Sequence, residues 1–181
     1  LMGVDSPSGK LADTFARDLA DYPSSPSFFV SDDYVEYNED IYVGYRYFET
    51  IPGAKEKVVY PFGYGLSYTT FALTEQKVTI NGDEITASVR VCNTGSVPGK
   101  EVVQVYFSAP QGKLGKPARQ LAGYAKTRLL QPGDEQTIII RFNAADMASY
   151  DDLGKICKSA WLLEKGSYTF HIGTSVRDTV K

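Results

Sequence analysis

Residues 67–181 consist largely of short runs in which apolar and polar side chains alternate, and this feature restricts the fold most. In the clearest run, residues 85–92, Ile, Ala and two Val alternate with Thr, Ser, Arg and Cys. Such a period of two places one face of a β-strand on a core. The Asn81-Gly82 pair just before it is typical of a β-hairpin turn. The pattern predicts strands over Phe71–Ile80, Ile85–Cys92, Glu101–Ala109, Gln120–Leu130, Glu135–Asn143, Lys155–Leu163 and Ser167–Thr174, with one helical turn over Ala144–Tyr150.

Seven short strands separated by frequent turns favour one fold class. They are typical of a fibronectin type III-like, immunoglobulin-like β-sandwich, so the expected fold is mainly β. A true immunoglobulin domain is not supported, because the Cys…Trp…Cys spacing of that family does not occur.

Residues 1–66 differ from the rest in composition. They carry 11 Asp/Glu and 5 Lys/Arg, a net charge of −6, whereas residues 67–181 carry 11 and 14, a net charge of +3. Nine of the 13 tyrosines lie between Tyr22 and Tyr68. The first 66 residues have too little periodic apolar content to close a core alone. We therefore expect a boundary near residue 66, with the tail of a larger domain before it.

Three parts of this N-terminal region have their own expectations. Leu1–Phe15 reads as a loop followed by a short strand. Asp21–Asp33, rich in Pro and Ser, reads as a linker or surface loop. Asp40–Phe48 is aromatic and β-prone.

Charge and cysteine content limit the kinds of partner. The formal net charge of −3 argues against a nucleic-acid or membrane-surface protein. No apolar run is long enough to span a bilayer, and Leu1–Asp5 does not resemble a signal peptide. Cys92 and Cys157 make no metal pattern, and no cofactor is expected. We expect both thiols to be unpaired and mostly buried, which favours the cytoplasm over secretion.

The segment VVYPFGYGLSYTTF, residues 58–71, invites a catalytic interpretation that its spacing does not support. A dinucleotide-binding loop needs a third glycine and a following helix, and a nucleophile elbow needs glycines flanking Ser67. Residues 95–100 likewise fall one residue short of a P-loop. The favoured interpretation is scaffold, with Gly63 and Gly65 allowing a tight path between packed rings.

Other candidate chemical groups also have a structural interpretation. The acidic pairs Asp32-Asp33, Glu39-Asp40 and Asp151-Asp152 are expected to be solvated or capping groups rather than the paired carboxylates of glycoside hydrolysis. His171, the single histidine, is expected on the exposed face of a strand, opposite Phe170 and Ile172. The aromatic candidates for sugar stacking are expected in a core or interface instead; they are Trp161, Tyr106, Tyr124 and the Tyr34–Tyr47 cluster.

Three motifs occur in an order that identifies a family. PSGKLADTF (residues 7–15), YNEDIYVGYRYF (37–48) and YPFGYGLSYTTF (60–71) together resemble the carboxyl-terminal part of a glycoside hydrolase family 3 enzyme of the β-glucosidase type. Ala12 and Ala16 stand where that family often has proline. The later motifs resemble the fibronectin type III-like domain of many members; they lie within Gly95–Tyr106, Leu121–Lys126, Leu130–Asp134 and Gly166–Gly173.

The resemblance also implies which parts are absent. Family members are retaining hydrolases with an aspartate nucleophile in a (β/α)₈ barrel and an acid/base glutamate in the following α/β sandwich domain. Ser31-Asp32-Asp33 lacks the Trp of the usual nucleophile motif, so no catalytic residue can be assigned here. The implied domains are the tail of the α/β sandwich domain with a surface loop (1–33), an aromatic-rich connector (34–66) and the fibronectin type III-like sandwich (67–181).

The leading functional hypothesis is a non-catalytic region that braces the catalytic domains of a β-glucosidase. The alternatives are a carbohydrate-binding module and an adhesion-type sandwich that binds proteins. The expected partners are the remaining catalytic domains, carbohydrate and a second copy in a homodimer, with no nucleic acid or membrane. The domain seam is expected at Tyr45, Arg46, Phe62, Tyr64 and Leu66, the last three largely buried.

Overall fold

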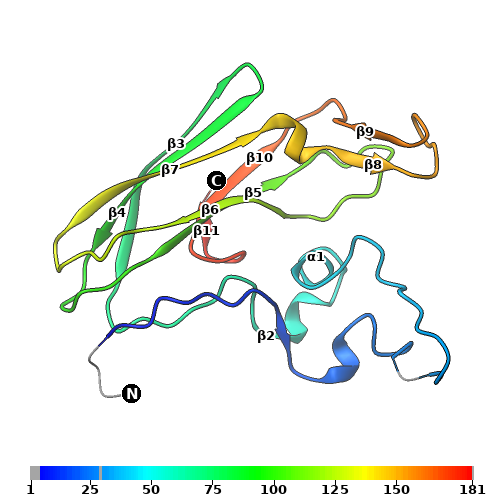
Figure 1. Cartoon of the computed structure of the whole chain (residues 1–181), viewed down its shortest axis with the longest axis horizontal. Coiled ribbons are helices and arrows are strands. Elements are labelled where there is room, and N and C mark those ends of the chain that lie inside the picture. The colour runs from blue at the N-terminus through cyan, green and yellow to red at the C-terminus, as the bar shows by residue number, and fades with distance from the viewer. Residues whose placement is uncertain (1–4, 29, 181) are drawn as a thin grey trace.

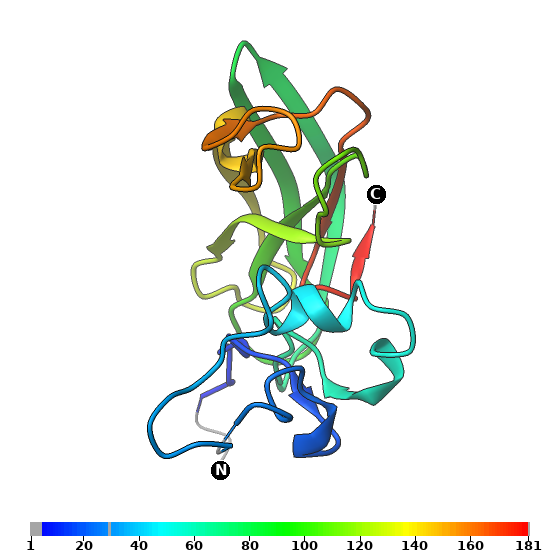
Figure 2. The ribbon, with the colours of Figure 1, turned by 90° about the vertical axis from the view of Figure 1, so that its right-hand side faces the viewer.

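Alternating burial along the strands produces a sandwich of two antiparallel sheets (Figures 1 and 2). The structure is a computed structural model that describes residues 5–28 and 30–180. One sheet has three strands in the order β3 (Phe71–Asn81), β4 (Glu84–Asn93) and β7 (Glu135–Asn143). The other has four in the order β11 (Thr179–Val180), β10 (Thr169–Gly173), β5 (Val102–Ser108) and β6 (Gln120–Lys126).

The predicted mainly β sandwich is therefore confirmed, and β4 shows why. Its apolar residues at every second position, from Ile85 to Val91, are buried, while the residues between them are partly exposed. They pack against inward-facing residues of the second sheet, including Val103, Val105 and Phe107. The predicted hairpin is also present, because Asn81 pairs with Glu84 across a turn in which Gly82 has φ +60°.

The strand predicted over Lys155–Leu163 is mostly wrong. After the 3₁₀ helix η3 (Ala144–Met147), the short strands β8 (Ser149–Asp151) and β9 (Ala160–Leu162) form a separate two-stranded sheet. The backbone N–H groups of residues 155–157 donate to the carboxylate of Asp151. Because these donors are committed to a side chain, they are not available for a strand ladder.

Residues before β3 form a small N-terminal layer beside the sandwich (Figures 1 and 2). β1 (Phe15–Ala16) pairs with β2 (Val58–Tyr60) in an antiparallel sheet. The layer also holds the 3₁₀ helices η1 (Leu19–Asp21) and η2 (Lys55–Lys57) and the single helical turn α1 (Tyr45–Phe48). Its own core is small and consists of Phe48, Ala54 and Val58.

The β-prone interpretation of Asp40–Phe48 is wrong over α1. Gly44 has φ +56° and turns the chain, and its carbonyl then accepts the N–H groups of Tyr47 and Phe48. This local hydrogen bonding satisfies the backbone as a helical turn, although aromatic residues favour strands.

The two cysteines agree only in part with the expectation of unpaired, mostly buried thiols. Cys92 and Cys157 are unpaired as expected, but only Cys92 is partly buried, and Cys157 is exposed on the loop between β8 and β9. Within residues 5–28 and 30–180, no helix has the length and apolar character needed to cross a membrane.

Candidate functional site

The residues of the VVYPFGYGLSYTTF segment join the N-terminal layer to the sandwich. The ring of Phe62 lies 4.6 Å from that of Tyr45 and 6.5 Å from that of Tyr106 on β5, measured between centroids. Tyr106 is fully buried, which raises the pKa of its phenol. The hydroxyl of Tyr45 also accepts the backbone N–H of Leu121 at 2.9 Å. We call this contact between the layer and the outer face of β5 the joint.

Gln104 is the polar centre of the joint. Its side chain is 3% exposed, and its Nε2 donates to the carbonyl oxygens of Thr174 at 2.7 Å and Gly63 at 3.4 Å. The Tyr106 hydroxyl donates to Gln104 Oε1. Gly63 has φ +80°, and a Cβ there would overlap the Gln104 amide. Gly63 therefore allows a tight backbone path as expected, but the group that it approaches is the Gln104 amide rather than a packed ring.

Two ion pairs reinforce the same contact. Arg177, between β10 and β11, donates from Nε to Glu49 Oε1 at 2.6 Å. Its Nη2 donates to the carbonyl of Lys55 at 3.0 Å. Lys10 Nζ lies 2.7 Å from Glu101 Oε1, with side chains 16% and 11% exposed. Partly buried pairs with this geometry resist separation, because removing one partner leaves an uncompensated charge.

His171 is buried, which corrects the expectation of an exposed strand histidine. It does lie opposite the inward-facing Ile172, but it is only 3% exposed. Its Nε2 lies 2.9 Å from Ser108 Oγ, which donates to the carbonyl of Ala118. The Ala118 N–H in turn donates to Thr50 Oγ1 in the N-terminal layer. Segments distant in sequence therefore cover this face, which strand alternation alone does not reveal.

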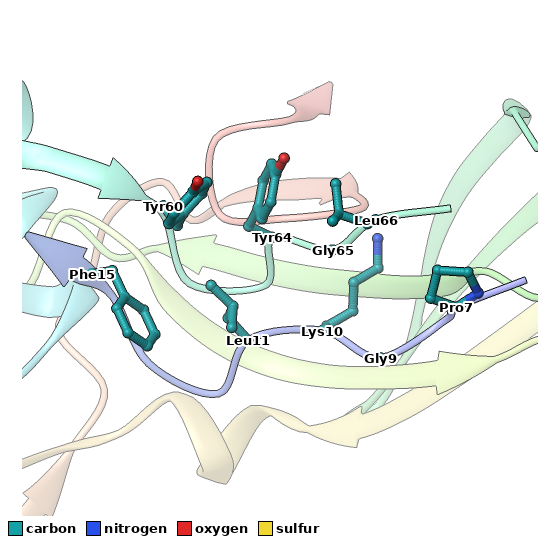
Figure 3. Close-up of a pocket in the computed structure, with 9 residues that line it drawn as sticks. All are labelled: Pro7, Gly9, Lys10, Leu11, Phe15, Tyr60, Tyr64, Gly65 and Leu66. Atoms are coloured by element: carbon teal, nitrogen blue, oxygen red, sulfur yellow. The ribbon is translucent and has the colours of Figure 1, made fainter. Parts of the chain in front are cut away.

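An apolar groove lies on the N-terminal layer (Figure 3). Residues 7–11 and 60–66 run side by side, and two hydrogen bonds of 2.8 Å between Leu11 and the Gly63–Tyr64 backbone hold them together. The groove has a volume of about 660 Å³. Its lining residues are Pro7, Gly9, Lys10, Leu11, Phe15, Tyr60, Tyr64, Gly65 and Leu66.

The exposure of the groove corrects one expectation about the seam. Leu66, expected to be largely buried, is 67% exposed, and Phe62 and Tyr64 are only half-buried. Phe15 and Tyr60 add exposed aromatic surface to the groove. Among the residues that the structure describes, none covers the groove side of the predicted seam, which is open to solvent.

The five predicted seam residues fall into three places. Tyr45 and Phe62 are in the joint, whereas Tyr64 and Leu66 line the groove. Arg46 is half-buried beside a smaller hollow that Asp13 also lines. It makes no ion pair with any described residue.

The remaining predicted candidates are dispersed. Asp32, Asp33 and Asp40 are exposed, and Asp151 is buried as the cap of a loop. No described residue that lines the groove carries a carboxylate or an imidazole. Across the ranges 5–28 and 30–180, no three His, Cys, Asp or Glu side chains are grouped to hold a metal ion. The arrangement suits packing against another apolar surface rather than acid–base chemistry.

Sequence reasoning missed Gln104 and the Arg177–Glu49 pair. A signal for Gln104 existed, since it is the one amide in the apolar run Val-Val-Gln-Val-Tyr. Arg177 and Glu49 are separated by 128 residues, so no local pattern connects them.

Comparisons with known proteins agree on one group of relatives. A fibronectin type III-like domain model matches residues 101–176. A β-glucosidase A of Butyrivibrio fibrisolvens is 65% identical over 99% of this chain, which corresponds to 23% of that protein. The crystal structure of a Paenibacillus barengoltzii β-glucosidase superimposes with a TM-score of 0.93 at 51% identity, covering 98% of this chain and 20% of that one.

A third relative is described as a member of glycoside hydrolase family 3 (GH3). The structure of a GH3 β-glucosidase from Bifidobacterium adolescentis has a TM-score of 0.87 and 35% identity, over 98% of this chain and 25% of that one. The chain thus spans about a fifth to a quarter of the length of the relatives it matches.

Proposed function

The chain belongs to the β-glucosidases of glycoside hydrolase family 3, as the C-terminal part with the fibronectin type III-like domain, and we propose that it braces the catalytic domains of such an enzyme. It supplies no catalytic residue itself. The observation that carries this proposal is the apolar groove, which lies on a layer already fixed to the sandwich by the joint.

The proposed occupant of the groove is the remainder of the longer enzyme. Exposed aromatic and aliphatic side chains gathered in one hollow mark a surface that another protein surface covers. The relatives are four to five times longer than this chain, so they contain ample additional structure. Because the joint immobilises the layer, a domain that packs into the groove becomes fixed relative to the sandwich.

We propose the same three parts as the sequence motifs imply. Residues 1–33 are the tail of an α/β sandwich domain with a surface loop, 34–66 the connector, and 67–181 the fibronectin type III-like domain. The separate small core around Phe48 supports a division before the sandwich.

The longer enzyme is proposed to hydrolyse terminal β-D-glucosides with retention, through two carboxylates outside these 181 residues. The support is that the relatives are β-glucosidases. The 181-residue chain is then expected to show no turnover of p-nitrophenyl β-glucoside. Turnover that persists after repeated purification, and that follows the concentration of the chain, would refute this assignment.

Mutation of the groove in the full-length enzyme tests the bracing role. Leu66→Asp places a charge on the proposed contact and is expected to lower the melting temperature of the catalytic domains. The matched control is Leu129→Asp, since Leu129 is exposed on a loop and is not among the residues that line the groove. Equal melting temperatures for both variants and the parent enzyme would contradict the bracing role.

Two further contacts are proposed with this function. In the isolated chain the uncovered groove is the surface for a homodimer, which sedimentation velocity would detect and Leu66→Asp would abolish. Carbohydrate is the second proposed partner, because the single tryptophan, Trp161, is 71% exposed.

A further inference from the structure

The hairpin formed by β8 and β9 carries an exposed aromatic pair. Tyr150 and Trp161 are directly paired across the two strands, with ring centroids 5.3 Å apart. They are 48% and 71% exposed. Both views place the hairpin at an end of the sandwich away from the N-terminal layer (Figures 1 and 2).

A buried carboxylate fixes the loop that completes this hairpin. Asp151 is 1% exposed, and its oxygens accept the N–H groups of Lys155, Ile156 and Cys157 at 2.7–2.9 Å. Burial raises the pKa of this carboxyl, but the N–H donors outweigh burial and hold the pKa below its ordinary value. Asp151 thus remains charged near neutral pH and continues to organise the loop.

The start of β9, which follows this loop, is held in place as well. The carbonyl of Asp151 accepts the N–H of Ser159 at 2.7 Å, and Ser159 has φ +61°. A non-glycine residue in this left-handed backbone conformation costs conformational energy, which the surrounding contacts must offset. Trp161 follows two residues later, so its backbone is held in place before any ligand binds.

The chemistry of the surface suits a neutral ring with hydroxyl groups. The two ring planes meet at 56°, so the pair presents an angled aromatic surface rather than a flat one. Asp152 and Lys158 are exposed nearby on the loop, and neither side chain bonds to any residue that the structure describes. Aromatic faces can contact the C–H groups of a sugar, while a free carboxylate and ammonium can bond to its hydroxyls.

We propose that Tyr150 and Trp161 form a binding site for one pyranose ring of a β-linked glucose oligosaccharide or glucan. The ligand class rests on the proposed function of the longer enzyme, whereas the site itself is separate from the groove. This aromatic pair gives the protein a contact with carbohydrate outside the catalytic domains.

The alternative occupant of this aromatic surface is a protein partner. The side chains of the loop between β8 and β9 distinguish a protein from a sugar. Leu153 and Ile156 are 72% and 45% exposed at the tip of the loop. A protein surface that covered the hairpin would also bury these two aliphatic side chains, since interfaces are centred on such residues. A single sugar ring stacked on the exposed faces of Tyr150 and Trp161 does not require them.

Because Trp161 is the only tryptophan, its fluorescence reports on this site alone. Titration of the 181-residue chain with cellotetraose is expected to give a saturable change in emission. Tyr150→Ala should weaken binding about tenfold, which corresponds to the loss of about 1.4 kcal/mol of aromatic contact. Tyr124→Ala, which removes a more exposed ring on β6, and Leu153→Ser should leave the affinity unchanged.

Calorimetry on Trp161→Ala and Trp161→Phe provides a second measurement that does not need the fluorophore. Trp161→Phe should retain more affinity than Trp161→Ala, with melting curves checking that both variants fold. No saturable signal up to the solubility limit of cellotetraose would overturn the proposal. So would an emission change that depends on protein concentration and disappears in Leu153→Ser, which would indicate protein contact.

The test of the sugar site is independent of the test of the bracing role. In the full-length enzyme, Trp161→Ala is expected to leave the melting temperature unchanged. A failed titration together with a destabilising Leu66→Asp variant would reject the sugar site and retain the brace. Saturable binding of cellotetraose together with an unchanged melting temperature in Leu66→Asp would reject the bracing role and retain the sugar site.

Discussion

The guanidinium of Arg177 donates from Nε to Oε1 of Glu49 at 2.6 Å, and so connects the end of the sandwich to the turn after α1. The Glu49 side chain is only 6% exposed and that of Arg177 24%. The second bond of Arg177, to the carbonyl of Lys55, adds another point of attachment. This residue therefore holds two backbone segments of the N-terminal layer against the sandwich.

Arg177→Met is expected to destabilise the chain by about 2 kcal/mol, between the values for exposed and fully buried pairs. The loss arises because Glu49 remains largely buried without its partner. The measurement is the free energy of unfolding in urea, and Glu49→Gln with the double variant completes a cycle that isolates the pair.

Arg90→Met is the matched control for this cycle. Arg90 pairs with Glu75 and Glu135, but all three side chains are at least 41% exposed. Its removal should cost less than about 1 kcal/mol. Equal effects of the two arginine variants would show that the Arg177 contact has no special role in the joint.

Gly63→Ala should destabilise the chain more than Gly53→Ala does. Both glycines have positive φ, +80° and +78°, so alanine introduces similar backbone strain at each, about 1–2 kcal/mol. At Gly53 a Cβ meets nothing within 4 Å, whereas at Gly63 it overlaps the Gln104 amide. The additional loss at Gly63, expected to be about 1 kcal/mol or more, measures the closeness of that contact.

Thermal unfolding of the two alanine variants side by side makes this comparison. If the melting temperatures are equal, the approach of the Gly63 backbone to Gln104 is not tight, and the polar centre of the joint is misassigned.

The buried pair of Lys116 and Glu164 should make stability depend on pH. Lys116 holds the pKa of the Glu164 carboxyl below its ordinary value of 4.5, and the N–H groups of Lys113 and Leu114 add to this effect while burial opposes it. A lowered pKa in the folded state stabilises the protein above pH 4.5. This contribution is lost as the pH falls through the folded-state pKa.

Glu164→Gln removes this titration and leaves Lys116 without its charged partner. It should cost about 3 kcal/mol at pH 7, the lower end for a broken buried pair. The difference between parent and variant should stay constant from pH 7 to pH 5 and shrink below pH 4.5. A difference that grows on acidification would contradict this sign.

Much of the fold follows from local sequence patterns. The period-two run at residues 85–92 and the Asn81-Gly82 turn predict β4 and its hairpin correctly, because burial of one face and turn geometry are local properties. The joint also has a partial local signal, since Tyr45 and Phe62 stand out as aromatic residues beside glycines.

The errors have both distant and local physical causes. His171 is buried by the loop that precedes β6 and by the N-terminal layer, and no alternation along β10 indicates this. Lys155–Leu163 was predicted as a strand because its composition permits one, but the Asp151 carboxylate takes its backbone donors. Leu66 was expected inside a seam and is exposed, since the groove that it lines is open within these residues.

Hydroxyl-radical footprinting tests most directly whether the groove is covered in the longer enzyme. Phe15, Tyr60 and Leu66 should be oxidised readily in the 181-residue chain and protected in the full-length enzyme. Tyr124, exposed but absent from the lining of the groove, should react equally in both and serves as the internal control. Equal oxidation of the three groove residues in the two proteins would contradict the bracing role.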